Sequence, residues 1–229
     1  MWDGVRRAAL FARQFRLRFR DTGSLAPSSR FLAWEITRRL AQTRDVPKQS
    51  GIPVAAAPLR VLECGAGTGA FTGQIVQLLR AGDRLDVVEI NPLFAAELRR
   101  RAANEPAWRD TPAKLLIHET PLQQFVLDPV DGDGYDFIIS GLPHVNFSPE
   151  LARDVAASYR RLLKPGGTLS YFEYAYIRPI RRLATLGRDS ARIRAVDQTM
   201  GELIASHHAD RTTVLANFPP AWVRHLRRV

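Results

Sequence analysis

The sequence predicts a doubly wound α/β fold, in which buried strands alternate with helices, preceded by a helical N-terminal extension. Two observations predict it. A short apolar run over residues 59–62 is followed by a glycine-rich loop and then by helical periodicity over residues 71–79. A second apolar run ends at Glu89, twenty residues after Gly69. The order strand, glycine loop, helix and strand forms the first unit of an open sheet that binds a nucleoside at the carboxyl ends of its strands.

The spacing of the glycines indicates which nucleoside the crevice binds. Dinucleotide enzymes use G-x-G-x-x-G to bring a pyrophosphate to a helix N-terminus, whereas here Gly65, Gly67 and Gly69 alternate behind Glu63. The Glu63 carboxylate repels a diphosphate but suits the ammonium group of S-adenosyl-L-methionine, and Glu89 can accept both hydroxyl hydrogens of a ribose. The alternative is a tight turn that binds no ligand, and the two acidic residues in register argue against it.

Composition indicates one domain with an extension. The 229 residues, 45% of them hydrophobic, suffice for one sizeable core, and we expect residues 1–45 to form the extension and residues 46–229 the nucleoside-binding domain. The single cysteine, Cys64, excludes an intramolecular disulfide and a cysteine-rich metal site, so we expect no metal. No apolar run approaches the ~18 residues of a membrane span, and arginines interrupt the N-terminus where a signal peptide needs an apolar core. We therefore expect a cytoplasmic protein.

The net charge of +10 is concentrated at the two ends of the chain. Residues 1–44 carry ten Arg against three acidic residues, a net charge of +7, and residues 178–229 carry ten Arg against four acidic residues, a net charge of +6. The middle of the chain, by difference, carries −3. Basic ends of this kind favour a polyanionic partner, either a nucleic acid or an anionic lipid surface.

The first twenty residues favour the lipid surface. On a helix, Phe11, Phe15 and Phe19 lie at i, i+4 and i+8, and arginines flank this aromatic face. A helix of this pattern lies in a bilayer interface with its guanidinium groups among phosphates, each contributing ~1 kcal/mol near an anionic surface. The alternatives are a helix that packs its Phe stripe on the domain and a helix that binds RNA. The predicted membrane-binding residues are Phe11, Phe15, Phe19, Arg13, Arg16 and Arg20.

A second helix is predicted just after this segment. Pro27 forces an extended approach, Ser28 or Ser29 can cap the helix, and residues 31–40 are apolar on one face. A helix N-terminus with two hydroxyl groups and Arg30 can also hold a phosphate, so Ser28, Ser29 and Arg30 are candidates for binding a lipid headgroup. Residues 45–58, rich in proline and small side chains, are predicted to link this helix to the first strand.

Three further strands are predicted. Residues 113–118 form the third and place Thr120 near an adenine, and residues 135–140 form the fourth, which stops at Ser140 and opens into a Gly/Pro loop at the edge where substrates bind. Residues 168–176 form the fifth. The predicted cofactor-binding residues are Glu63, Gly65, Ala66, Gly67, Gly69, Glu89, Ile90, Thr120 and Ser140.

The C-terminal part shows a helix and a closing strand pair. Residues 191–206 have helical periodicity, and residues 212–216 and 222–226 are predicted to form an antiparallel pair separated by two prolines. His207 and His208 have no partner at metal-ligand spacing, so we predict that they are surface residues.

These motifs resemble those of the class I S-adenosylmethionine-dependent methyltransferases. The resemblance rests on the glycine loop behind Glu63, the acidic strand end at Glu89, and Leu-Lys-Pro-Gly-Gly at residues 163–167. Residues 23–30, 140–147 and 217–223 are similar to those of the small bacterial phospholipid N-methyltransferases that methylate phosphatidylethanolamine, and the similarity runs from about residue 8 to the C-terminus. It implies a Rossmann-like, mostly parallel seven-stranded sheet with helices on both faces.

The resemblance also implies a reaction, namely methylation of phosphatidylethanolamine towards phosphatidylcholine at the inner face of the cell membrane, with S-adenosyl-L-homocysteine as the second product. Ser140 and His144 depart from the strand-four loop of the related rRNA adenine dimethyltransferases, which argues against an RNA substrate. Thr120 stands where methyltransferases often have Asp, so adenine contacts there can come from the backbone. His144 stands where the lipid family more often has an apolar residue, which leaves the amine open and admits an ornithine lipid.

The implied chemistry is an in-line displacement, in which a neutral amine attacks a sulfonium methyl and positive charge moves from sulfur to nitrogen. The protein aligns the two groups and tolerates a cationic product, which the aromatic faces of Tyr174 and Tyr176 can stabilise. His144 or a tyrosine hydroxyl can pass the proton to water, and Asn146 lies in the same loop. The predicted catalytic residues are Tyr174, Tyr176, His144 and Asn146.

We expect an aminophospholipid and an anionic membrane surface as partners, a monomer when the protein is in solution, and no nucleic acid. Two other functions stay open. One is an RNA base methyltransferase that uses the same fold and its basic ends, and the other is a cofactor-binding relic that acts as a membrane-surface adaptor.

Overall fold

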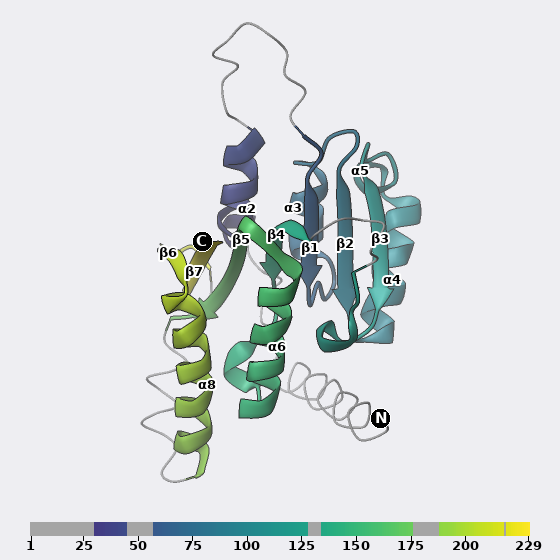
Figure 1. Cartoon of the computed structure of the whole chain (residues 1–229). Coiled ribbons are helices and arrows are strands. Elements are labelled where there is room, and N and C mark those ends of the chain that lie inside the picture. Colours follow the sequence, from purple (N-terminus) through teal and green to yellow (C-terminus); the bar gives the residue numbers. More distant parts are fainter. Residues whose placement is uncertain (1–29, 45–56, 128–133, 176–187, 218) are drawn as a thin grey trace, which may run out of the picture.

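The computed structural model describes residues 30–44, 57–127, 134–175, 188–217 and 219–229. In this part of the chain a seven-stranded sheet has the order β3-β2-β1-β4-β5-β7-β6 (Figure 1). Its strands are β1 (Arg60–Cys64), β2 (Arg84–Glu89), β3 (Lys114–Glu119), β4 (Tyr135–Ser140), β5 (Leu163–Tyr174), β6 (His207–Val214) and β7 (Ala221–Arg228).

Most of the sheet is parallel. β1 pairs in parallel with both β2 and β4, and the parallel pairing continues outward to β3 and β5. β7 lies antiparallel between β5 and β6. The edge at which β1 to β5 end is called the carboxyl edge below, and the opposite edge the amino edge. The predicted fold class, a mostly parallel seven-stranded sheet with helices, is confirmed.

Helices cover both faces of the sheet (Figure 1). α2, α3, α4 and α5 lie on one face, and α6 and α8 lie on the other together with the short η1. Two helices start at an extended residue whose side chain accepts from the first turn, Asn91 before α4 and Ser148 before α6, each followed by Pro at the first helical position. The helical elements are α2 (Arg30–Arg44), α3 (Ala70–Val76), α4 (Pro92–Asn104), α5 (Pro106–Arg109), η1 (Leu122–Gln124), η3 (His144–Asn146), α6 (Pro149–Leu162) and α8 (Arg188–Ala205).

The apolar core has two layers, one on each face of the sheet. Central strands carry continuous apolar runs because both of their faces are covered, as Val61 and Leu62 in β1 and Ile138 and Ile139 in β4 illustrate. α2 belongs to the layer that contains Val61 and Ile139, through Leu32, Ile36 and Leu40. The predicted second helix therefore packs into the same core as the sheet.

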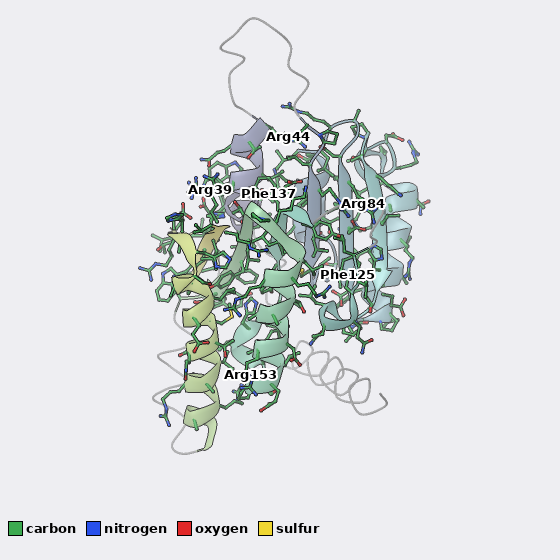
Figure 2. The ribbon with its side chains drawn as sticks, viewed as in Figure 1. Arg39, Arg44, Arg84, Phe125, Phe137 and Arg153 are labelled. Carbon is green, nitrogen blue, oxygen red and sulfur yellow. The ribbon has the colours of Figure 1, made fainter. Side chains whose placement is uncertain are left out.

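Polar contacts also fix α2 on the sheet. At its C-terminal end, Arg44 forms a buried ion pair with Asp83, which lies at the amino edge just before β2 (Figure 2). In the middle of the helix, Glu35 pairs with Arg38 at 2.8 Å and lies 3.5 Å from His225 of β7. His225 in turn shares a hydrogen bond of 2.8 Å with Ser170 of β5. We call this set of contacts beneath α2 the polar seam.

Arg39, which Figure 2 labels, extends the seam by an ion pair with Asp210 of β6. Burial lowers the pKa of His225 below its ordinary value, in favour of the neutral ring that can share a proton with Ser170.

Several boundaries differ from the sequence prediction. α3 ends at Val76 rather than residue 79, and β5 already begins at Leu163. Between residues 163 and 168 the pairing with β4 is irregular, because Tyr135 faces Leu163 whereas Phe137 faces Thr168. β6 begins at His207, five residues before the predicted strand, because its pairing with β7 extends to Arg228. In the described ranges no helix has the length and apolar character needed to cross a membrane.

Candidate active site

The candidate site, called the crevice below, lies where the strand order reverses, at the loops that follow β1 and β4. The loop after β1 is anchored to β2, because the Gly65 N–H donates to the Val88 carbonyl at 2.8 Å. The loop after β4 is anchored to β1, because the Gly141 N–H donates to the Cys64 carbonyl at 2.8 Å. The two loops thus leave the sheet side by side at the carboxyl edge, the place where doubly wound sheets bind their ligands.

Backbone conformation and close packing explain why the loop after β1 carries glycines. Gly65, Gly67 and Gly69 all have positive φ, at 70°, 57° and 87°. A Cβ at Gly69 would lie 2.5 Å from the Trp108 ring, so close packing also excludes a side chain there. A Cβ at Gly67 would meet nothing within 4 Å. The backbone at Gly67 therefore faces open space, and a ligand can approach it closely.

Arg101 and Trp108, which the sequence analysis missed, hold the glycine loop against α4 and α5. Arg101 of α4 donates to the Thr68 carbonyl at 2.6 Å and lies 4.2 Å above the ring of Trp108 in α5. Arg101 is itself held by Glu105 at 2.8 Å. Arg101 and Trp108 come from ordinary helical sequence, and only the fold brings them to the loop.

Glu63 occupies a fully buried position at the end of β1. The Thr72 hydroxyl of α3 donates to its Oε2 at 2.6 Å, whereas its Oε1 has no hydrogen-bond partner among the described residues. Burial raises the pKa of Glu63 to about 8, against the opposing hydrogen bonds from Thr72. The carboxyl group is therefore mostly protonated at neutral pH and carries one polar atom without a partner in the described chain.

Glu89, at the end of β2, joins the glycine loop to the start of α4. Its Oε2 accepts from the Gly67 N–H and its Oε1 from the Asn91 N–H, both at 2.8 Å. Burial raises the pKa of Glu89 above its ordinary value, although these backbone donors oppose the change. Each carboxylate oxygen keeps a further lone pair, so the group can accept from a ligand without releasing the loop. Asn91 has a separate role as the cap of α4.

The loop after β4 is fixed by a chain of buried hydroxyl and imidazole groups. The Ser140 hydroxyl and the Tyr159 hydroxyl of α6 are 2.7 Å apart, and His144 Nε2 lies 2.9 Å from the same Tyr159 hydroxyl. The His144 ring is 2% exposed and makes edge contacts with Phe147 and Tyr171. Tyr159 thus connects the last residue of β4 to the start of η3.

An aromatic row leads from α3 to the end of β5. The Phe71 and Phe172 rings are 5.8 Å apart, and the Phe172 and Tyr174 rings 5.4 Å apart, both edge to face. Tyr174 is half-buried, and burial raises the pKa of its hydroxyl group, so the hydroxyl stays protonated at physiological pH. Its ring thus offers an apolar face and a polar tip near the carboxyl edge.

Comparisons with known proteins identify the family. The family described as methyltransferase domain matches residues 61–167, which include both loops of the crevice. Over 147 residues the chain is 32% identical to an ornithine lipid N-methyltransferase of Singulisphaera acidiphila, and the alignment covers 64% of this chain and 67% of that protein. The chain belongs to the class I S-adenosylmethionine-dependent methyltransferases. Its methyl donor is accordingly S-adenosylmethionine.

Two further comparisons show how widely the methyl acceptors of similar proteins vary. The O-methyltransferase TomG of Streptomyces achromogenes, solved in complex with SAM, superposes with a TM-score of 0.64 at 13% identity, over 98% of this chain and 89% of that chain. A tRNA1(Val) (adenine(37)-N6)-methyltransferase of Aeromonas hydrophila subsp. hydrophila is 27% identical over 126 residues, which cover 48% of this chain and 50% of that protein. The superposition shows the fold alone, and the two proteins are named for different kinds of methyl transfer.

The crevice of this methyltransferase fits its cofactor chemically. The buried Glu63 oxygen without a partner can accept from an ammonium group, and the open backbone at Gly67 leaves room beside the Glu89 carboxylate. Ala66 is buried within the glycine loop, and Ile90 and Thr120 are partly exposed directly after β2 and β3. The topology thus brings the predicted cofactor residues to one edge of the sheet, and their contacts with the ligand stay predictions. In the described residues no cluster of metal-ligating side chains occurs.

The predicted substrate residues are placed only in part. Arg30 is exposed at the first residue of α2, and Asn146 is the last residue of η3. His144 lies inside the domain and not on its surface, so its predicted exchange of a proton with water needs a path through the loop. Other predicted residues lie outside the described ranges, namely Ser28, Ser29, Tyr176, Phe11, Phe15, Phe19, Arg13, Arg16 and Arg20.

The two predicted surface histidines lie in β6. His207 is half-buried and shares a hydrogen bond of 2.8 Å with the Leu203 carbonyl through Nδ1, whereas His208 is exposed. The prediction therefore holds for His208, and His207 is an end-of-helix contact between α8 and β6.

Proposed function

We propose that this methyltransferase methylates the amino group of a membrane aminolipid, with phosphatidylethanolamine and ornithine lipid as the two candidate substrates. The observation that carries the proposal is the 32% identity to an ornithine lipid N-methyltransferase over about two thirds of each protein. The basic ends of the chain support it, because an enzyme that takes its substrate from an anionic membrane needs a cationic surface. Two acceptors are kept because both present a primary amine beside an anionic headgroup.

The main task of the chain's own residues would be to bind the cofactor and the acceptor amine and to orient them towards each other. Bound S-adenosylmethionine supplies an electrophilic sulfonium methyl group. Glu63 would hold the ammonium group and Glu89 the ribose hydroxyls. The backbone of the glycine loop would lie against the bound cofactor. Tyr159, through Ser140 and His144, keeps the loop after β4 in one conformation beside the crevice. Such fixed alignment of donor and acceptor can lower the barrier by several kcal/mol without covalent participation of the protein.

The Tyr174 ring would stabilise the positive charge that develops on the acceptor nitrogen. Its aromatic face would stabilise a methylated ammonium by roughly 0.5–2 kcal/mol, and this interaction needs no hydrogen on nitrogen. It therefore persists when an amine gains a second or third methyl group. The incoming amine must be unprotonated. The candidate for accepting its proton is His144, because the raised pKa of Tyr174 keeps that hydroxyl protonated and unable to act as the base.

The assay uses S-adenosylmethionine with a labelled methyl group. Purified protein would be incubated separately with vesicles that contain phosphatidylethanolamine, vesicles that contain ornithine lipid, and structured RNA. We expect label in one or both lipids and none in RNA, with the number of added methyl groups resolved by thin-layer chromatography. Glu89→Ala is the control that abolishes transfer. Label in RNA alone would overturn the proposal, and vesicle binding without transfer to either lipid would favour an adaptor.

A further inference from the structure

Large exposed hydrophobic side chains are unevenly distributed over the described part of the chain. Phe31 and Trp34 lie in the first turns of α2, with exposed fractions of 46% and 58%, and Leu215 follows β6 with 73%. Leu93, in the first turn of α4, is also at the carboxyl edge. Of the remaining two, Val126 lies in the connection from β3 to β4 and Val229 after the end of β7 at the amino edge. Such apolar groups on one edge indicate an interaction surface.

The direction of α2 brings Phe31 and Trp34 towards the carboxyl edge. The C-terminal residue Arg44 is fixed at the amino edge by Asp83, whereas Glu35 lies beside His225 in the middle of β7. The helix therefore advances towards the carboxyl edge as it is followed back to its N-terminus. Phe31 lies a further four residues, about 6 Å, along this axis. Helical side chains also lean towards the N-terminus, so both rings point the same way.

Leu215 reaches the same edge from β6. β6 runs antiparallel to β7, which itself runs antiparallel to β5, so β6 ends where the parallel strands end. The turn between β6 and β7 is pinned by Asn217, whose side-chain amide donates to the Pro219 carbonyl at 2.7 Å. α2 packs against both strands of this hairpin. Phe31, Trp34 and Leu215 therefore belong to neighbouring elements on the edge that also carries the crevice.

The surroundings of these three residues favour a lipid surface as their partner. The Arg30 guanidinium lies 4.9 Å from the centre of the Phe31 ring, so a cation and two aromatic rings stand together at the start of α2. Trp and Phe next to Arg are typical of the water–bilayer interface, where rings enter at headgroup level and guanidinium groups meet phosphate. The acidic residues nearby, Glu35 and Asp210, are already paired with arginines of α2. Residues 1–29, with six Arg against two Asp, join the domain at this point.

We propose that Phe31, Trp34 and Leu215 form a membrane contact of the folded domain, which seats the carboxyl edge on an anionic bilayer with Arg30 at a lipid phosphate. This contact is separate from the predicted amphipathic segment of residues 1–20. It rests on the proposed function, since it turns the crevice towards the layer in which lipid amines lie. A lipid would then need to move only a short way out of the bilayer to reach the cofactor.

Cysteine labelling tests the contact directly. Cys64 is the only cysteine and is fully buried, so an environment-sensitive fluorophore attached at Trp34→Cys or Leu215→Cys reports from that position alone. With vesicles of phosphatidylcholine and phosphatidylglycerol we expect a blue shift at both positions. The matched control is Val229→Cys, 80% exposed at the opposite edge, where we expect no shift.

Three results would overturn the contact. They are an unchanged spectrum at positions 34 and 215, an equal shift at position 229, and a shift that appears without vesicles and grows with protein concentration, which would indicate contact between two copies of the chain. If the unchanged spectrum with vesicles is accompanied by a shift with RNA, the surface binds nucleic acid instead.

An affinity measurement separates this contact from the proposed function. The double variant Phe31→Ser/Trp34→Ser should bind the same vesicles about tenfold or more weakly, whereas Val229→Ser should bind like the wild type. Cofactor affinity by calorimetry should be unchanged in both, which shows that the domain is folded. If the double variant binds vesicles more weakly than Val229→Ser but the wild type methylates no lipid, the function fails while the contact stands. If lipid is methylated and the double variant binds vesicles normally, the contact fails while the function stands.

Discussion

Replacing Glu63 by Gln should change how the stability of the ligand-free domain depends on pH. In the folded chain the buried carboxyl group binds its proton with a pKa of about 8, against 4.5 ordinarily, because burial disfavours the ionised form. Between these two pH values the folded state holds a proton that the unfolded state has released, so the free energy of unfolding falls as pH rises. Glutamine has nearly the same shape and does not titrate. Its oxygen can still accept from Thr72.

The size of the effect follows from the two pKa values. Each pH unit between them costs the wild type at most about 1.4 kcal/mol, which gives a ceiling of about 5 kcal/mol across the window. Proteins relax around a buried charge, so we expect about 2 kcal/mol between pH 5 and pH 8. Burying the glutamine amide costs the same free energy at every pH. It therefore shifts the whole curve of unfolding free energy against pH for Glu63→Gln and leaves the slope of that curve unaffected.

Urea unfolding at pH 5, 6, 7 and 8 measures this difference. The stability of Glu63→Gln relative to wild type should rise steadily with pH. Glu119→Gln, an exposed carboxylate paired with Arg99 at the end of β3, is the matched control and should follow the wild type. Parallel pH curves for wild type and Glu63→Gln would show that Glu63 is already ionised in the folded domain, and would refute the reasoning.

The same substitution tests the proposed contact with the cofactor. A cationic ammonium group beside Glu63 favours the ionised carboxylate, so binding of S-adenosylmethionine at neutral pH should release a proton to the buffer. Calorimetry in two buffers of different ionisation enthalpy detects that proton. Glu63→Gln should bind more weakly and without this release, and an unchanged proton count in the variant would place the ammonium elsewhere.

Further substitutions test the rest of the site. Glu89→Ala should abolish detectable cofactor binding by calorimetry, and normal affinity would contradict the placing of the ribose. Gly69→Ala should destabilise the domain by more than about 2 kcal/mol in urea unfolding, because residue 69 has a positive φ and its Cβ would lie 2.5 Å from the buried Trp108 ring. The control Gly166→Ala has a positive φ of 74° but no atom within 4 Å of its Cβ, so it should cost only about 1 kcal/mol. Tyr159→Phe removes a hydroxyl shared by two partners and should lower kcat about tenfold with little change in cofactor affinity; an unchanged kcat would contradict its positioning role. Phe15→Asp, outside the described residues, should weaken vesicle binding and spare cofactor binding, and intact vesicle binding would favour the packed-helix alternative.

The sequence alone places the predicted cofactor residues at one edge of the sheet, because their spacing along the chain is local. Gly65, Gly67 and Gly69 follow a strand directly. Glu63 is the penultimate residue of β1 and Glu89 is the last residue of β2, so spacing alone brings them to one edge. Arg101 and Tyr159 could not be found in this way. Each is an ordinary residue on a helix, and it reaches its partner only through the packing of that helix against the sheet.

The substrate half was less predictable. His144 follows a strand and a Gly/Pro loop, a position that favours an exposed side chain, but Tyr159, Tyr171 and Phe147 enclose it in the core. Nothing in the local pattern distinguishes a loop that opens to solvent from one that folds back. The early start of β6 has a similar cause, since it depends on the pairing of His207 with Arg228, which lies 21 residues further along the chain.

The polar seam beneath α2 has a mechanical consequence. A helix held by apolar contacts alone can shift or turn about its own axis more easily, whereas Arg39 and Arg44, paired with Asp210 of β6 and with Asp83 before β2, can satisfy their partners at only one rotation. α2 therefore acts as a rigid strut between the sheet and whatever precedes it. A force applied at the N-terminal end of α2 would tilt the whole domain as one body, and the crevice would keep its shape while its orientation changes.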